Sequence, residues 1–317
     1  MSEDLTQRHS AFRFHGSWQE FAKIAFPNLL LSIVTLGIYR FWATTREREY
    51  LWAQTDFIDE RLEWTGKGME LFIGFIMVFL LLGLPFIVIQ LISQGLIFRG
   101  ETVLAGVITL VMFLLLFYLT GVAYFRALRY RLSRTYWRGI RGGSNDPGFR
   151  YGLSYMWRSF VGWLPIFLLV PWSMISLWNE RWNAMSFGPH RFEANADWKP
   201  LMKRYLLFYL VPFLLVAGII TMAIVAAASG DQLGAVGGAG MAVGVVIVVV
   251  AVLSLYIILP LAALAFYSKY FRLAVGGLRL HNLEFDFRAR APDWILFFLA
   301  NMAIVICTLG IGYIFMP

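Results

Sequence analysis

The sequence predicts an all-α polytopic membrane protein that carries small cytoplasmic β-hairpins and is built from internal repeats. The composition is the first reason. Of its 317 residues, 59% are hydrophobic and 15% are charged, whereas soluble domains average about 45–50% apolar and about 25% charged residues. The second reason is a series of about seven long apolar segments. A helix needs roughly 20 apolar residues to cross about 30 Å of hydrocarbon, and most of these segments reach that length.

The apolar segments differ in how well they fit a simple crossing. Segments 24–43 and 160–178 are barely long enough, and both contain proline, which breaks helices. The sequence leaves two interpretations open: these two segments cross the membrane as tilted helices, or they enter it and turn back as re-entrant hairpins. The full set of segments is 24–43, 71–98, 102–125, 160–178, 205–228, 241–267 and 294–316.

One block of sequence occurs twice. The stretch Asn28–Trp42, N-L-L-L-S-I-V-T-L-G-I-Y-R-F-W, returns near the end as Asn301–Tyr313, N-M-A-I-V-I-C-T-L-G-I-G-Y. The Thr follows the Asn at the same spacing in both copies, and an alternating aromatic pair precedes both. We therefore predict one membrane domain, 1–317, divided into repeat-like units at about 1–70, 71–159, 160–204, 205–293 and 294–317.

The polar stretches between segments predict small hairpins. Apolar residues alternate with polar ones around a short turn in 57–64, 187–192 and 280–287, and this period of two is typical of strands. Stretch 126–159 fits the pattern less well, because a glycine-rich insertion follows its alternating run.

The distribution of charge bears on the topology. The formal net charge is +8, and cytoplasmic loops of membrane proteins are enriched in Lys and Arg. If all seven segments cross, many arginines fall on the outer side whichever way the chain is threaded. If 24–43 and 160–178 turn back, only Arg99 of the 27 Lys and Arg residues does so. This count favours re-entry and places most basic loops in the cytoplasm.

The sequence contains no recognisable catalytic constellation. Its four histidines and one cysteine form no metal-binding spacing, and it has no G-x-S-x-G motif and no P-loop. We expect no enzyme activity, no cofactor, no metal and no catalytic residue. The basic character is explained by anionic headgroups, so no nucleic-acid partner is expected.

Two groups of residues are candidate functional sites. The first consists of polar and glycine positions in the repeated block, which line a membrane path or pack two repeats together: Asn28, Thr35, Gly37, Asn301, Thr308 and Gly310. The second consists of arginines at the ends of apolar segments, which are candidate contacts to lipid headgroups: Arg46, Arg48, Arg126, Arg129, Arg181 and Arg272.

The chain resembles a known family in the blocks F-x-F-H-G at Phe12–Gly16, N-L-L-L-S-I-V-T-L-G-I-Y-R-F-W and M-S-F-G-P-H-R-F at Met185–Phe192. They resemble the YjgN-type family of bacterial inner-membrane proteins. The resemblance covers nearly the whole chain and implies a multi-pass protein of the inner membrane, but it implies no activity.

Two functions remain open at this point. The first is a channel or permease for a small uncharged solute, whose path the re-entrant segments would line. The alternative is a scaffold that does not transport and that binds anionic lipid or a protein partner through a basic, aromatic cytoplasmic face. Membrane lipids are the expected partners in either case, and a homo-oligomer or a protein partner is compatible with both.

Overall fold

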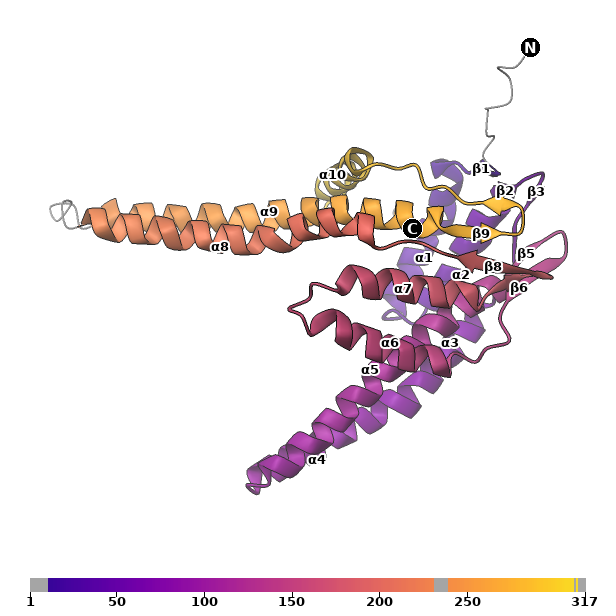
Figure 1. The fold of residues 1–317 in the computed structure, drawn as a ribbon. Helices are drawn as coiled ribbons and strands as arrows, with labels where there is room; N and C mark the ends of the chain where they lie inside the picture. The colour runs from indigo at the N-terminus through magenta and orange to yellow at the C-terminus, as the bar shows by residue number, and fades with distance from the viewer. Residues whose placement is uncertain (1–10, 231–238, 311, 313–317) are drawn as a thin grey trace, which may run out of the picture. The chain divides into compact units, whose positions relative to one another are not determined.

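A computed structural model describes residues 11–230, 239–310 and 312 (Figure 1). These residues form two compact units. Within the described ranges, the first unit comprises residues 11–160, 180–192, 303–310 and 312, and the second comprises residues 161–179, 193–230 and 239–302. Each unit is mostly helical, with short strands between pairs of helices. The prediction of a helical protein with small β-sheets is therefore confirmed.

The first apolar segment folds as a helical hairpin rather than as one helix. Helix α1 (Trp18–Val34) ends where the backbone of Leu36 and Gly37 turns to positive φ, and α2 (Arg40–Ala53) runs back along it. The two ends meet again, because the Tyr50 hydroxyl accepts a hydrogen bond from the Ser17 N–H at 2.9 Å and donates one to the Ser17 carbonyl at 3.0 Å. Segment 24–43 thus returns toward the end at which it began.

Two long apolar helices follow in the first unit. One consists of α3 (Gly68–Val78), the π-helical turn η1 (Phe79–Gly83) and α4 (Leu84–Phe98), and the other is α5 (Thr102–Ser133). Both are long and apolar enough to cross a membrane, as is Ile258–Gly276 within α9. The expected number of about seven apolar segments is not confirmed, since three helices among the described residues meet this criterion.

A second helical hairpin follows, formed by α6 (Phe149–Trp163) and α7 (Val170–Asn183). Ile166 and Phe167 have positive φ at its turn. Gly162 lies so close to Ser173 that an added Cβ would come within 3.1 Å of the Ser173 Cβ. Segment 160–178 is therefore interrupted in the same way as 24–43.

The second unit contains two long helices, α8 (Met202–Gly230) and α9 (Ala239–Gly276), which run side by side (Figure 1). The 3-10 turn η2 (Lys199–Leu201) precedes them and α10 (Ala291–Cys307) follows. The buried core lies at the end of the pair near η2 and comprises Ile175, Ala196, Leu201, Tyr205, Phe266, Tyr270 and Ala274.

Four tight hairpins connect the helices. In each, the first residue of a two-residue turn has positive φ, namely Ile58, Arg138, Gly188 and His281. The strands are β1 (Phe12–Phe14), β2 (Thr55–Phe57), β3 (Glu60–Arg61), β4 (Glu63–Trp64), β5 (Thr135–Trp137), β6 (Ile140–Gly143), β7 (Ser186–Phe187), β8 (His190–Ala194), β9 (Leu278–Leu280) and β10 (Leu283–Glu284).

The strands pair in antiparallel order. In the first unit β1 pairs with β2 and β2 with β3, and β4 to β8 pair in sequence; in the second unit β9 pairs with β10. The stretch 135–141, expected to fit less well, forms a regular hairpin because Gly139 accepts the positive φ that its turn requires. The last strand ends at Glu284, so the run 285–287 is not part of it. The internal repeat as a whole stays a prediction, and what recurs is the geometry of these turns.

Candidate functional site

The repeated Thr-Leu-Gly block forms the turn of a helix end in both copies. The Thr35 hydroxyl donates to the Leu31 carbonyl at 2.7 Å and accepts from the Tyr39 N–H at 2.9 Å. The Thr308 hydroxyl likewise donates to the Ile304 carbonyl at 2.6 Å. Both side chains therefore satisfy backbone groups that a helix end leaves without partners.

Glycine is required directly after this turn. Gly37 and Gly310 have φ of +87° and +93°, and their N–H groups donate to carbonyls five residues earlier, at 2.7 Å in both cases. This left-handed cap is the usual helix ending that glycine permits at no steric cost. The predicted residues Thr35, Gly37, Thr308 and Gly310 thus share a local role in shaping two turns.

The two asparagines of the repeated block lie in different environments. Asn28 is 2% exposed and sits between α1 and α2, where its amide nitrogen donates weakly to the Ala43 carbonyl at 3.4 Å and to Glu47 at 3.5 Å. Asn301 is half-buried on α10. Burial raises the pKa of the Glu47 carboxyl, and the Asn28 hydrogen bond and the Arg48 charge oppose that rise.

Of the predicted headgroup arginines, Arg46 and Arg48 lie in the middle of α2 and the others lie in the later turns of α5, α7 and α9. Several of them stack on aromatic rings. The guanidinium carbons of Arg46, Arg48 and Arg126 lie 5.7, 5.1 and 5.0 Å from the ring centres of Tyr39, Trp64 and Phe149. Such cation–π contacts are typical of a helix that meets headgroups. Of the others, Arg129 donates to the Asp146 carbonyl, Arg181 lies near the end of α7, and Arg272 donates to the Ser268 carbonyl within α9.

An open cleft of about 550 Å³ lies between α3 and α5 in the first unit. We name it the α3/α5 cleft. Most of its walls are apolar, while one end carries three arginines: Arg48, Arg126 and Arg131. The complete lining is Arg48, Glu70, Leu71, Gly74, Val78, Leu82, Leu119, Val122, Ala123, Arg126, Ala127, Tyr130 and Arg131.

The structure thus brings together two of the predicted arginines, Arg48 and Arg126, with a third that the sequence analysis missed. Arg131 lies within electrostatic range of Arg48 and Arg181. Burial lowers the pKa of the Arg48 guanidinium. Helical periodicity could have revealed Arg131, because residues three and four apart share a helix face and Ala123, Ala127 and Arg131 follow one another at four-residue spacing along the α5 wall of the cleft.

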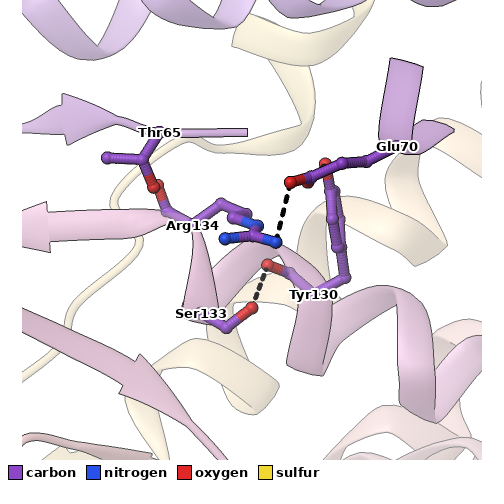
Figure 2. A network of polar contacts seen from close by, with 5 residues as sticks. All are labelled: Thr65, Glu70, Tyr130, Ser133 and Arg134. Carbon is purple, nitrogen blue, oxygen red and sulfur yellow. Dashed lines mark hydrogen bonds and ion pairs between the residues drawn. The ribbon is translucent and has the colours of Figure 1, made fainter. Parts of the chain in front are cut away.

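A polar network braces the arginine end of the cleft (Figure 2). Glu70 of α3 receives hydrogen bonds from Arg134 at 2.9 Å and from Tyr130 at 3.2 Å, one on each carboxylate oxygen. The Ser133 hydroxyl donates to the Tyr130 carbonyl at 2.9 Å, and the Thr65 N–H donates to the Arg134 carbonyl at 3.0 Å. Glu70 is therefore paired with Arg134 and Tyr130, and it forms no ion pair with Arg48, Arg126 or Arg131.

Among the residues that the structure describes, none of the three cleft arginines forms an ion pair with a carboxylate. In the same part of the chain no cluster of three His, Cys, Asp or Glu side chains is placed to hold a metal ion. The α3/α5 cleft therefore offers an apolar slot and a cationic end, and an anionic amphiphile is the ligand that matches both.

Three helices among the described residues are long and apolar enough to cross a membrane, and together with the arginines and aromatic rings near the cleft they indicate a membrane protein. The chain belongs to the family described as "Bacterial protein of unknown function (DUF898)", whose profile matches residues 9–317. The resemblance to YjgN-type proteins is thereby confirmed.

Two relatives are named Inner membrane protein YjgN. The one from Escherichia coli strain K12 is 26% identical over 247 residues, and the one from Escherichia coli O157:H7 is 25% identical over 247 residues. Each match covers 66% of this chain and 59% of the relative's own length. No solved structure matches the chain significantly.

Proposed function

We propose that this protein is a non-enzymatic protein of the bacterial inner membrane that binds anionic lipid through the basic, aromatic ends of its helices. The observation that carries this proposal is the cluster of Arg48, Arg126 and Arg131 in the α3/α5 cleft, which has no carboxylate partner among the described residues. Each arginine near an anionic membrane surface contributes about 1 kcal/mol of attraction, so the cluster gives a real preference for anionic headgroups.

The charge distribution supports a cytoplasmic location of this arginine end. Arg126, Arg129 and Arg131 follow the apolar part of α5, whereas the turn at its other end contains Arg99 as its basic residue. The inner leaflet carries the negative surface potential that attracts such segments. Cysteine labelling at Ser17 and Thr55 tests the accompanying proposal that α1 and α2 form a re-entrant hairpin, since it predicts that both positions are labelled from the same side.

The lipid proposal is tested by reconstituting the full chain with mixed phosphatidylcholine and phosphatidylglycerol and measuring which lipid co-purifies. We expect phosphatidylglycerol to be enriched over its share in the mixture. We further expect that enrichment to weaken at high salt, which screens exposed charges. Co-purification in proportion to the mixture would contradict the proposal.

The alternative, a channel for a small uncharged solute, has weaker support. Its proposed path residues Thr35 and Thr308 spend their hydroxyls on their own helix turns, and a polar side chain so engaged is less available to a solute. Thr35→Val is expected to cost about 1 kcal/mol of stability, because the Tyr39 N–H loses its hydrogen bond to the Thr35 hydroxyl. Solute flux into proteoliposomes, measured for the wild type and for the Asn28→Leu/Asn301→Leu double variant, distinguishes the two functions. A lower flux in the double variant without a loss of stability would favour the channel.

A further inference from the structure

We propose that the α3/α5 cleft holds one phospholipid of the basic-side leaflet, with its anionic headgroup at Arg48, Arg126 and Arg131 and one acyl chain in the slot from Gly74 to Leu82. This inference rests on the proposed function and adds to it a defined site, a stoichiometry of one lipid per chain and a slot for the chain. Its support comes from the charge, the depth and the construction of the cleft.

The charge of the cleft fits a single anionic headgroup. Arg48 and Arg131 lie within electrostatic range of each other. Arg48 is half-buried and Arg126 and Arg131 are exposed, and the mutual repulsion of like charges is unfavourable unless an anion offsets it. Each guanidinium has five N–H donors. The Nε of Arg131 binds the Ala127 carbonyl at 3.4 Å, and the Nε of Arg126 binds the Pro147 carbonyl at 3.2 Å. These bonds hold both side chains in place, and each leaves further donors for a phosphate.

The depth of the cleft matches one leaflet. On α3 and the following turn η1 its lining runs from Glu70 through Gly74 and Val78 to Leu82, one residue for each helical turn. At 1.5 Å of rise per residue this run is about 18 Å long, and half of a hydrocarbon core is about 15 Å. The opposite wall on α5 runs from Arg131 back to Leu119. An acyl chain that follows its headgroup into the bilayer therefore lies along both walls.

The π-helical turn keeps the slot open. The Leu84 N–H donates to the Phe79 carbonyl five residues earlier, and such turns are frequent at functional sites. Beyond this turn α4 packs closely on α5, whereas α3 packs on α2 instead. The pair of spans therefore separates at the level of α3 and leaves room for a ligand.

Gly74 determines the width of the slot. A Cβ added at Gly74 would meet no heavy atom within 4 Å, although the residue lines the cleft. A larger side chain can therefore be introduced there without a clash inside the protein. This makes Gly74→Leu a test of the slot rather than of the fold.

The experiment uses the full chain in nanodiscs of phosphatidylcholine with a minority of phosphatidylglycerol, and native mass spectrometry counts the lipids that each chain retains. We expect one retained phosphatidylglycerol in the wild type. Gly74→Leu should lower its occupancy about tenfold, because an inserted side chain excludes the acyl chain as overpacking does in a core. Gly106→Leu on α5 is the matched control, since a Cβ there also meets nothing within 4 Å, and it should retain the lipid.

Two further experiments distinguish the contributions of the headgroup and of the acyl chain. Arg131→Gln should reduce retention about fivefold, the effect of one arginine at an anionic surface. Inorganic phosphate and glycerol phosphate carry the negative charge of the headgroup but have no acyl chain. At the same concentration as phosphatidylglycerol, neither should displace the bound lipid. Displacement by either would overturn the slot, because the charge alone would then account for binding.

The outcomes separate this inference from the proposed function. If phosphatidylglycerol is enriched around the protein but Gly74→Leu retains it as the wild type does, the slot is wrong and the general lipid preference stands. If no preference for anionic lipid is seen at all, both fail. Should Gly74→Leu unfold, which its thermal melting would reveal, Val78→Trp fills the same slot from the next turn and must give the same tenfold loss.

Discussion

Helix α5 faces α6 on one side and α3 on another, and the glycines that lie at these two sides, Gly121 of α5 and Gly74 of α3, have different surroundings. Toward α6, a Cβ added at Gly121 would lie 2.6 Å from the Cβ of Tyr155, so the two helices approach closely there. Toward α3, a Cβ added at Gly74 would meet nothing within 4 Å. The same residue type closes one helix pair and leaves the other open.

The closed side is also filled with aromatic rings. Phe117 lies 5.3 Å from both Tyr155 and Phe160 by ring centres, and Phe125 lies 5.5 Å from Tyr151. Because lipid tails are as apolar as side chains, association of membrane helices depends on such close packing. A small residue in a membrane helix can therefore lie either at a close helix–helix contact or beside an open cleft, and the residues opposite it determine which.

The largest effect that tests this comparison is expected from Gly121→Leu. The new side chain must displace Tyr155, and overpacking of this kind costs about 3 kcal/mol of unfolding free energy. Gly74→Leu should cost nothing and should gain about 0.5 kcal/mol, because leucine favours a helix more than glycine does. Unfolding in mixed detergent micelles measures both variants. Equal losses in the two variants would mean that the α3/α5 cleft closes in solution.

The sequence predicted much of this fold and little of the cleft. The spans around 71–98 and 102–125 and the hairpins near 57–64 and 187–192 follow from local rules for apolar length and alternation. These features depend on neighbours in the chain, and the sequence contains that information directly.

The cleft was missed because it depends on where α5 ends and on what stands opposite it. The apolar segment was expected to end at 125, with polar loop after it, but the helix continues to Ser133. The last turns of α5 are therefore helical as well, and Arg131 lines the same cleft as Arg126. Whether Gly74 packs or stays open is a matter of tertiary distance, and no local pattern encodes it.

A smaller effect is expected from Glu70→Gln, which weakens the brace at the open side. The amide still accepts from Tyr130 but loses its charge attraction to Arg134, whose side chain and that of Glu70 are each 34% exposed. A half-exposed pair of this kind contributes about 1 kcal/mol or less. We expect a loss of that size in micellar unfolding, and a weaker retention of anionic lipid because the arginine end is then less well ordered. Glu63→Gln on the nearby strand β4 is the control, since that side chain is exposed.

The smallest effect is on the pH dependence of stability, and it tests whether Glu47 neutralises Arg48 at the cationic end of the cleft. Burial raises the pKa of Glu47 above its usual 4.5, so the folded protein holds that proton at a pH where the unfolded chain has released it. Stability contributed by this group is therefore lost as the pH rises from about 4.5 through the raised pKa. Glu47→Gln should flatten the pH dependence of the melting temperature in that window, by a small amount because Glu47 is only half-buried.

The direction in which stability changes with pH shows whether burial or the charge of Arg48 dominates at Glu47. If attraction to the neighbouring Arg48 outweighed burial, the pKa of Glu47 would instead be depressed, and the wild type would gain stability relative to Glu47→Gln as the pH rose through the same window. That result would make Glu47 the internal partner of Arg48. The cleft would then hold only two uncompensated arginines, and its contrast with the closed side of α5 would rest on space alone and no longer on charge.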